Sequence, residues 1–249
     1  MSDSPFLSLV LPAYREARRL PPTLERLAEF CAGLGQAYEV LIMVERSLDG
    51  TLEIAAEFAA RQAHFHAIDN QVQRGKGYAV RSGMLRARGQ HVFYMDADLS
   101  VPLREIPVFL EYFATHPEVD VLIGNRQHAE SRITRSQSWL RRTMGQTFNA
   151  ILQRCALAPS RDTQCGFKAF RRAAAQEIFR RQKLDGFAFD VEVLLLAQRL
   201  GYGIADLPVE WLNSPESHVH IFRDSLQMLR DSLRVRRLVE ETLRQDRNS

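Results

Sequence analysis

Short apolar runs alternate with amphipathic segments along the first half of the chain. The apolar runs have the length and composition of buried parallel strands, and they lie at residues 6–11, 38–44, 65–68 and 92–95. Apolar residues at helical spacing separate them, at residues 21–32, 49–58 and 77–87. This alternation predicts an α/β fold, with a mostly parallel sheet covered by helices on both faces.

Prolines and one polar residue mark the ends of several of these elements. The first strand is expected to stop at Pro12. Pro21 or Pro22 suits the first turn of the first helix, because a proline there costs no hydrogen bond. Asp49 is a good N-cap for the second helix.

The second half of the chain changes character. It has helical patterns at 106–114 and 191–200 and strand patterns at 119–123, 167–171 and 204–212, where Pro208 suits an edge strand. A basic amphipathic stretch covers residues 137–157, and a basic helix is expected at 221–243. The leucines of that helix suit packing against the protein, which we prefer over docking on a membrane. No repeat or linker divides the chain, so residues 1–249 are predicted to form a single domain.

The composition is that of an ordinary soluble globular protein, with 45% hydrophobic and 25% charged residues. The formal charge of +3 gives no argument for nucleic acid as a partner. Positive charge does gather between Arg126 and Arg142, which favours either an anion contact or a solvated helix face. The three cysteines form no C-x-x-C pair, so neither a disulfide framework nor a structural zinc site is expected.

Neither a signal peptide nor a membrane span is expected from the hydrophobic pattern. The first residues lack a basic segment followed by an apolar one, and no run of 18 apolar residues occurs. We therefore expect a cytoplasmic protein, either soluble or bound at the cytoplasmic face of a membrane.

Two aspartates, Asp96 and Asp98, directly follow the apolar run at residues 92–95. In open α/β sheets the ligand crevice lies at the carboxyl ends of the strands. Mg²⁺ and Mn²⁺ prefer carboxylate oxygens, often together with substrate phosphates. The pair therefore predicts a metal that holds a diphosphate, although an isolated D-x-D is also typical of a plain turn.

Five segments, taken in order, resemble the family 2 glycosyltransferases, which have the GT-A fold. They are LPAYREA (11–17), DGT (49–51), RGKG (74–77), DAD (96–98) and DTQCGFK (162–168). DTQCGFKAF (162–170), FAFDVEVLLLAQ (187–198) and LPVEW (207–211) look closest to the polyprenyl-phosphate glycosyltransferases, especially the dolichyl-phosphate glucosyltransferases. The resemblance extends over about residues 7–236.

The resemblance implies donor contacts in the first half, at about residues 6–125. Pro12, Tyr14 and Glu16 would meet the nucleobase and ribose, although this segment alone is more typical of a strand-to-helix turn. Lys76 would meet the diphosphate or the nucleobase edge, in a loop that is not a Walker A motif. Glu45 would supply the carboxylate that meets the nucleotide.

The resemblance makes Asp98 the direct metal ligand, with Asp96 near the ribose or the metal. The chain departs from the family pattern at Glu45-Arg46-Ser47, where relatives usually carry two consecutive acids and one more residue. Arg46 places a positive charge where an acid is usual. This departure motivates the alternative that the protein binds a nucleotide sugar without transferring it.

Residues of the acceptor half, at about 126–249, would orient the acceptor and the sugar. Asp162 is either a base or a holder of Arg and Lys side chains, because a phosphate monoester is already ionised near neutral pH. Asp190 either contacts the sugar or pins the start of a helix, and Glu192 has the same two alternatives. Gln164 would also meet the sugar, and four arginines are candidates for binding the acceptor phosphate: Arg126, Arg132, Arg135 and Arg223.

The motifs and the family resemblance together imply an inverting glycosyltransferase that depends on Mg²⁺ or Mn²⁺. It would move a hexose, glucose from UDP-glucose, to a polyprenyl phosphate such as dolichyl or undecaprenyl phosphate. The basic cluster would then lie beside an anionic membrane surface. The alternative within the same fold is transfer to a soluble acceptor.

Overall fold

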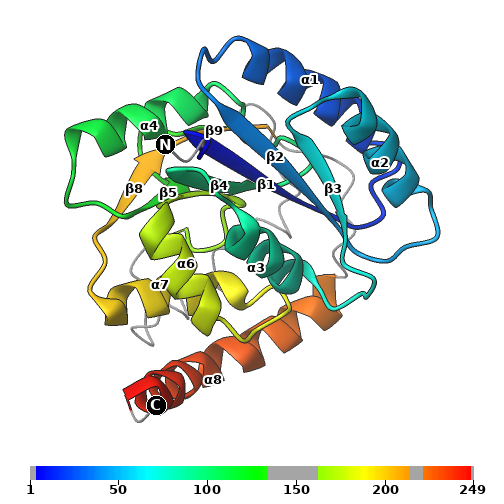
Figure 1. Ribbon diagram of the computed structural model, residues 1–249. Coiled ribbons are helices and arrows are strands. Elements are labelled where there is room, and N and C mark those ends of the chain that lie inside the picture. Colours follow the sequence, from blue (N-terminus) through cyan, green and yellow to red (C-terminus); the bar gives the residue numbers. More distant parts are fainter. Residues whose placement is uncertain (1–3, 134–161, 213–220, 248–249) are drawn as a thin grey trace.

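The structure, a computed structural model, describes residues 4–133, 162–212 and 221–247 (Figure 1). The predicted basic stretch at 137–157 lies outside these residues. Within the described parts of the chain, no helix is both long and apolar enough to cross a membrane.

A seven-stranded sheet forms the centre of the molecule, with the strand order β3-β2-β1-β4-β7-β5-β8. Its strands are β1 (Leu7–Ala13), β2 (Tyr38–Val44), β3 (Phe65–Asp69), β4 (His91–Met95), β5 (Val121–Asn125), β7 (Phe167–Arg171) and β8 (Ile204–Pro208). Strand β7 runs antiparallel to β4 and β5, and the other pairs are parallel. The predicted, mostly parallel sheet is therefore confirmed. A separate two-stranded pair joins β6 (Arg132–Ile133) to β9 (Glu210–Trp211).

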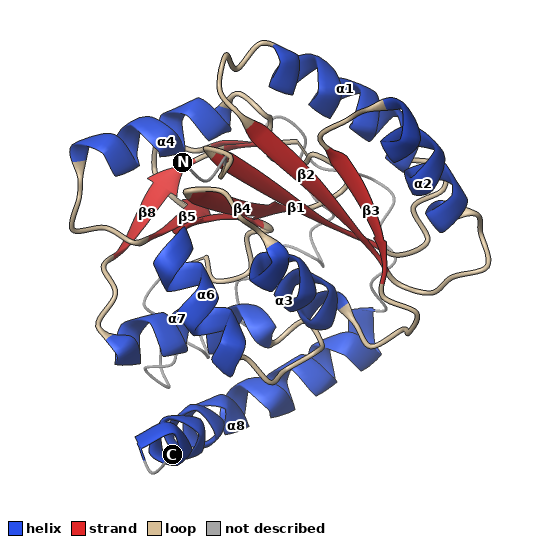
Figure 2. Cartoon of the chain, in the orientation of Figure 1, coloured by secondary structure: helices blue, strands red, loops and turns tan. Residues whose placement is uncertain are grey.

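Helices cover both faces of the sheet (Figure 2). On one face lie α1 (Leu20–Ala32), α2 (Thr51–Arg61) and α4 (Glu105–Thr115); on the other lie α3 (Lys76–Arg86), α6 (Arg172–Arg181), α7 (Phe189–Leu200) and α8 (Ile221–Arg247). Alternate residues of a strand point to opposite faces. Leu9 accordingly packs in the core on the side of α1, α2 and α4, and Val10 packs in the core on the side of α3, α6 and α7. Burial on both faces explains why the strands are continuous apolar runs rather than alternating ones.

The carboxyl ends of β1, β2, β3, β4 and β5 lie along the same edge of the sheet, because these strands are mutually parallel. Strand β7 begins at this edge, because it is antiparallel to its neighbours. Three non-glycine residues with left-handed backbone follow β1, β3 and β4 here: Arg15, Gln71 and Leu99, at φ 57°, 60° and 48°. Such conformations are costly and gather where chain geometry serves a function.

The first strand continues two residues past the predicted stop, through Pro12 to Ala13. Strand β4 pairs with β1 only as far as Val10. The side of β1 that faces β4 therefore has no strand partner beyond Val10. The backbone nitrogen of Pro12 faces that side. The carbonyl of the neighbouring Ala13 faces the opposite side, toward β2, where it accepts the Glu45 N–H. The missing proline N–H leaves no sheet hydrogen bond unmade.

Three further boundaries differ from the predictions. Residues 204–212 form two strands in different sheets, although Pro208 does end an edge strand. Helix α6 was not predicted, yet its buried Ala174, Ala175, Ile178 and Phe179 have helical spacing. The N-cap of α2 is Gly50 and not Asp49, although the Asp49 Oδ1 does accept the N–H of Thr51, the first residue of the helix, at 3.3 Å.

Candidate active site

The loops at the carboxyl-end edge bring most of the predicted site residues together. Strand β4 lies centrally in the sheet, between β1 and β7, and the Asp96–Asp98 segment follows it. The predicted donor residues follow β1, β2 and β3 on one side of β4. Arg126 follows β5, and Asp162 to Gly166 precede β7, on the other side.

Asp96 is paired with a lysine from the loop after β3. The Lys76 Nζ lies 2.6 Å from the Asp96 Oδ1. Burial alone would lower the pKa of the Lys76 ammonium, but the Asp96, Asp190 and Asp98 carboxylates outweigh burial and raise that pKa. Lys76 is therefore a firmly protonated cation in contact with the D-x-D segment.

Asp98 contacts a backbone N–H group, whereas Asp96 contacts a lysine. Its Oδ1 accepts the backbone N–H of Ser100 at 2.9 Å. Burial and the neighbouring Asp96 charge raise the pKa of Asp98, and the Ser100 contacts and Arg19 only partly oppose them. A divalent cation at this point would relieve the repulsion between the two carboxylates.

The carboxylate oxygens at this strand end suit a metal ion that the substrate also helps to bind. Within the described residues, no group of three or more His, Cys, Asp and Glu side chains gathers to hold an ion. Asp96 and Asp98 offer two hard oxygen donors at one strand end, and Mg²⁺ commonly uses one or two carboxylates together with substrate phosphates. The two side chains therefore suit Mg²⁺ or Mn²⁺ in the presence of a diphosphate.

Glu45 is buried, 3% exposed, at the end of β2. Its Oε1 accepts the backbone N–H groups of Arg74 and Gly75, at 3.1 and 2.7 Å. Burial raises the pKa of Glu45, although these hydrogen bonds oppose the shift. The carboxylate thus holds the loop that carries Lys76, and its predicted contact with the nucleotide stays a prediction.

The segment after β1 is held by neighbouring side chains. Glu16 forms an ion pair with Arg19, in which the Arg19 Nη2 lies 2.6 Å from the Glu16 Oε1. The Glu16 N–H donates to the Thr51 Oγ1 at 2.9 Å. Tyr14 is half-buried. The predicted nucleotide contacts of Pro12, Tyr14 and Glu16 are not tested by these interactions.

Asp162 and Arg126 form a two-pronged ion pair on the acceptor side. The Arg126 Nε and Nη2 donate to the two carboxylate oxygens at 2.7 Å each, and the Arg126 N–H donates to Oδ2 at 2.9 Å. Asp162 is fully buried, whereas 26% of the Arg126 side chain is exposed. Burial opposes ionisation of Asp162, but the guanidinium outweighs burial and lowers the pKa of the carboxyl. The guanidinium also lies over the Trp211 ring, 5.7 Å from its centre.

Asp190 lies beneath the D-x-D strand. Its Oδ1 is 2.6 Å from the Nζ of Lys168, which is fully buried, and it also accepts the Tyr94 hydroxyl. Lys168 donates as well to the Cys165 carbonyl at 2.7 Å. These contacts tie the start of α7 to β4 and β7, as one of the two predicted alternatives for Asp190 has it. Contact of Asp190 with the sugar stays a prediction.

The remaining predicted residues lie at the margin of the described structure. Gln164 is half-buried, and its Nε2 lies 3.5 Å from the Phe187 carbonyl. Arg132 is exposed in β6. Arg135 and the side chain of Arg223 lie outside the described residues.

Two polar residues of the site were missed. Lys168 stands inside one of the resembling segments, but nothing local marks it as fully buried. Asp185 lies in the connection between α6 and α7, and its Oδ2 accepts the Arg74 Nε at 2.8 Å. Asp185 and Arg74 are 111 positions apart, so no spacing rule connects them.

Comparison with known proteins shows the family of the chain. The sequence model of Glycosyl transferase family 2 matches residues 8–179. The chain is 34% identical over 244 residues to a dolichyl-phosphate beta-glucosyltransferase of Drosophila melanogaster, covering 93% of this chain and 75% of that protein. It is 31% identical over 244 residues to the dolichyl-phosphate beta-glucosyltransferase of Dictyostelium discoideum, covering 94% and 75%.

A solved structure shows the same fold. The glucosyl-3-phosphoglycerate synthase from Mycobacterium tuberculosis, in complex with Mg²⁺ and uridine diphosphate, superposes with a TM-score of 0.62. The sequence identity is 17%, and the match covers 93% of this chain and 79% of that one. At this identity the likeness concerns the fold.

A first prediction concerns the close approach of Gly166 to Asp96. A Cβ at Gly166 would overlap the Asp96 carboxylate, whereas a Cβ at Gly186 would meet nothing within 4 Å. Gly166→Ala should therefore push the Asp96 carboxylate, a side-chain end and not backbone, away from Lys76 and lower the free energy of unfolding by up to about 1 kcal/mol in urea titrations. Gly186→Ala serves as the control and should be neutral or slightly stabilising. Equal stabilities of the two variants would contradict this packing.

A second prediction concerns Glu192, which is 1% exposed at the start of α7. Burial raises the pKa of its carboxyl from 4.5 to about 7. Between about pH 4.5 and 7 the folded protein therefore keeps a proton on Glu192 that the unfolded chain has lost. The stability that the protonated Glu192 contributes to the fold is fully present below about pH 4.5 and is lost as the pH rises to about 7. Relative to Glu192→Gln, the wild type should lose up to roughly 3 kcal/mol of unfolding free energy over that range. Parallel pH profiles from urea titrations would refute the assignment.

Proposed function

Because the chain belongs to glycosyl transferase family 2, we propose that it transfers glucose from UDP-glucose to a polyprenyl phosphate. It is a glycosyltransferase with the GT-A fold, as the resemblance predicted. The relatives named above support glucose as the sugar and a dolichyl phosphate as the acceptor. The UDP bound in the Mycobacterium tuberculosis enzyme of the same fold supports uridine as the nucleoside.

One observation carries this proposal: two separate cations flank the D-x-D segment. Lys76 touches Asp96 from the donor side, and Arg126 is held on the acceptor side by Asp162. Asp96 is the main charge that raises the pKa of Lys76, and the pKa of Arg126 is raised mainly by Asp162 with a smaller contribution from Asp96, so both cations interact with the Asp96 charge. Such an arrangement suits a reaction in which a diphosphate departs on one side and a phosphate attacks from the other.

A metal ion would be held by Asp96 and Asp98. When bound, Mg²⁺ or Mn²⁺ supplies neutralisation of the charge that grows on the leaving diphosphate. Lys76 would exchange its contact with Asp96 for an oxygen of the diphosphate. The half-buried Tyr14, together with Pro12, Glu16 and Glu45, would then face the nucleoside.

Asp162 would act as a holder and not as a base. Its pKa is lowered by Arg126, so its carboxylate has little tendency to take a proton. A phosphate monoester needs no base, because it is already ionised near neutral pH. Asp162 would therefore fix the Arg126 guanidinium, which would orient the acceptor oxygen for a single displacement with inversion. Gln164 and Asp190 would lie toward the sugar.

A lipid acceptor would bring this edge of the protein to a membrane surface on its cytoplasmic face. Phe187 and Leu212 are large apolar side chains on the acceptor side, 37% and 40% exposed. The exposed Arg132 lies in β6, which pairs with β9 next to Leu212. Apolar and basic side chains together suit contact with an anionic membrane.

The transfer itself can be measured directly. Purified protein with UDP-[¹⁴C]glucose, Mg²⁺ and polyprenyl phosphate in detergent should give label that extracts into organic solvent. GDP-mannose should give much less label under the same conditions. Label found only on a water-soluble acceptor would favour the alternative acceptor class. Binding of UDP without any turnover would show a nucleotide-sugar-binding protein instead.

The role of Asp162 can be separated from that of a base by a double-mutant cycle. As a holder, Asp162→Asn and Arg126→Gln should each lower kcat/KM for polyprenyl phosphate by about 10- to 100-fold, the cost of a charged hydrogen bond. The kcat/KM of the double variant should be no lower than that of the less active single variant, because both substitutions remove the same interaction. The exposed Arg237→Gln is the control. Near-complete loss for Asp162→Asn, with a mild and additive effect of Arg126→Gln, would identify a base.

A further inference from the structure

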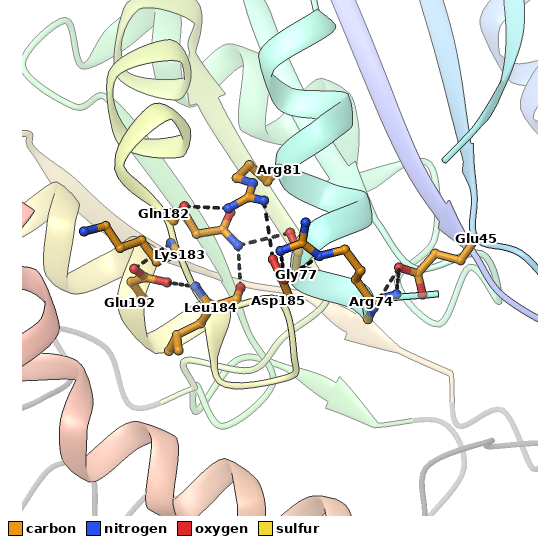
Figure 3. Close-up of polar contacts among 10 residues, drawn as sticks. Glu45, Arg74, Gly77, Arg81, Gln182, Lys183, Leu184, Asp185 and Glu192 are labelled. Atoms are coloured by element: carbon orange, nitrogen blue, oxygen red, sulfur yellow. Dashed lines mark hydrogen bonds and ion pairs between the residues drawn. The ribbon is translucent and has the colours of Figure 1, made fainter. Parts of the chain in front are cut away.

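A short connection from the acceptor half packs directly against the loop that carries Lys76. This connection, residues 182–188, joins α6 to α7, and the donor loop, residues 74–77, leads into the start of α3 (Figure 3). The Asp185 carbonyl accepts the Tyr78 N–H at 3.2 Å. A Cβ at Gly75 would lie 2.6 Å from the Asp185 carbonyl oxygen, and one at Gly77 would lie 2.5 Å from that of Leu184. The two glycines of the loop are thus needed for its close approach to this connection.

The Asp185 carboxylate binds side chains on both sides of Lys76 along the chain. Its Oδ2 accepts the Arg74 Nε at 2.8 Å, and its Oδ1 lies 3.4 Å from the Arg81 Nη2. Both guanidinium groups also lie near the Tyr78 ring, 4.6 and 5.4 Å from its centre. One carboxylate therefore accepts hydrogen bonds from the residue two positions before Lys76 and forms a longer ion pair with another in the second turn of α3.

The connection is itself held by hydrogen bonds with the Gln182 side chain and with Glu192 of α7. The Gln182 side-chain amide donates to the Gly77 and Leu184 carbonyls, at 3.0 and 2.7 Å. The buried Glu192 carboxylate accepts the Lys183 and Leu184 N–H groups, at 2.8 and 2.7 Å. Figure 3 shows these contacts as one continuous set that runs from Glu192 to Arg74 and Glu45. Asp185 is consequently presented by a fixed backbone.

The donor loop is held between two carboxylates that come from distant parts of the chain. Glu45 binds the Arg74 and Gly75 N–H groups from the end of β2, and Asp185 binds the Arg74 side chain from the acceptor half. Lys76 follows directly and reaches Asp96. Removing Glu45 would free the two backbone N–H groups before Lys76, and removing the Asp185 carboxylate would release the Arg74 and Arg81 side chains on either side of it.

We propose that Asp185 is a positioning residue for the donor: it touches no substrate, but through Arg74 and Arg81 it holds Lys76 where the diphosphate binds. This inference rests on the proposed function, in that Lys76 meets the diphosphate of the nucleotide. The two glycines that flank Lys76 allow the backbone of the same connection to come this close to the loop. The acceptor half thereby takes part in donor binding, through a residue outside every segment that carries the family resemblance.

Binding of UDP in the presence of Mg²⁺, measured by calorimetry, tests this role. Asp185→Asn should raise the Kd for UDP about 10-fold, by loss of one charged contact worth roughly 1.4 kcal/mol. Lys76→Met sets the full effect, and the double variant should bind no more weakly than Lys76→Met alone. Asp185→Glu should recover part of the affinity. The control is Lys183→Gln, an exposed side chain in the same connection, which should bind like the wild type.

The outcomes separate this inference from the proposed function. Wild-type affinity in Asp185→Asn, or losses that add to those of Lys76→Met, would overturn the positioning role. Weaker binding accompanied by a lower melting temperature than that of Lys183→Gln would show a general structural role and would also overturn it. If the wild type binds UDP but transfers no sugar, the proposed reaction fails while the binding comparison still decides the role of Asp185. If transfer occurs, KM for UDP-glucose should rise in Asp185→Asn while KM for polyprenyl phosphate stays unchanged.

Discussion

Two carboxylates at the end of one buried strand repel each other, and the loops around them supply the charges that counter this repulsion. Asp96 and Asp98 follow β4, where burial raises the pKa of Asp98. Lys76 reaches Asp96 from the loop after β3, and this contact requires the loop to be fixed. Glu45 and Asp185 fix it from opposite sides. The geometry of the whole donor side follows from the need to place one ammonium against one carboxylate.

Buried ion pairs extend this arrangement into the acceptor half. Lys168 with Asp190 and Arg126 with Asp162 place charges where transfer from water costs several kcal/mol per ion. Good geometry and further hydrogen bonds offset that cost, as the Tyr94 hydroxyl and the Cys165 carbonyl do for the first pair. The Lys168–Asp190 pair ties α7 to β7, which neighbours β4, and the Arg126–Asp162 pair ties the end of β5 to the segment before β7. They therefore fix relative positions more than they add stability.

The sequence was sufficient for the features that depend on local pattern. Apolar runs predicted the strands of the parallel sheet, and the two aspartates could be placed at its carboxyl edge because parallel strands end together. The contacts that orient these groups could not be predicted, because Asp185 meets Arg74 across 111 positions and Asp190 meets Lys168 across 22. Only the fold brings them together. Pro12 illustrates the same limit, since its place inside β1 depends on where β4 stops pairing.

Asp96, Asp98 and Lys76 are proposed to bind a diphosphate together with a divalent cation. This can be measured by calorimetric titration of the wild type with UDP and with UMP, each with and without Mn²⁺. Mn²⁺ should strengthen UDP binding by about 10-fold or more, a gain of roughly 1.4 kcal/mol, and should leave UMP binding nearly unchanged, because UMP has no diphosphate to share the cation with the two aspartates. Equal affinities for UDP and UMP, with no effect of Mn²⁺ on either, would contradict this proposal.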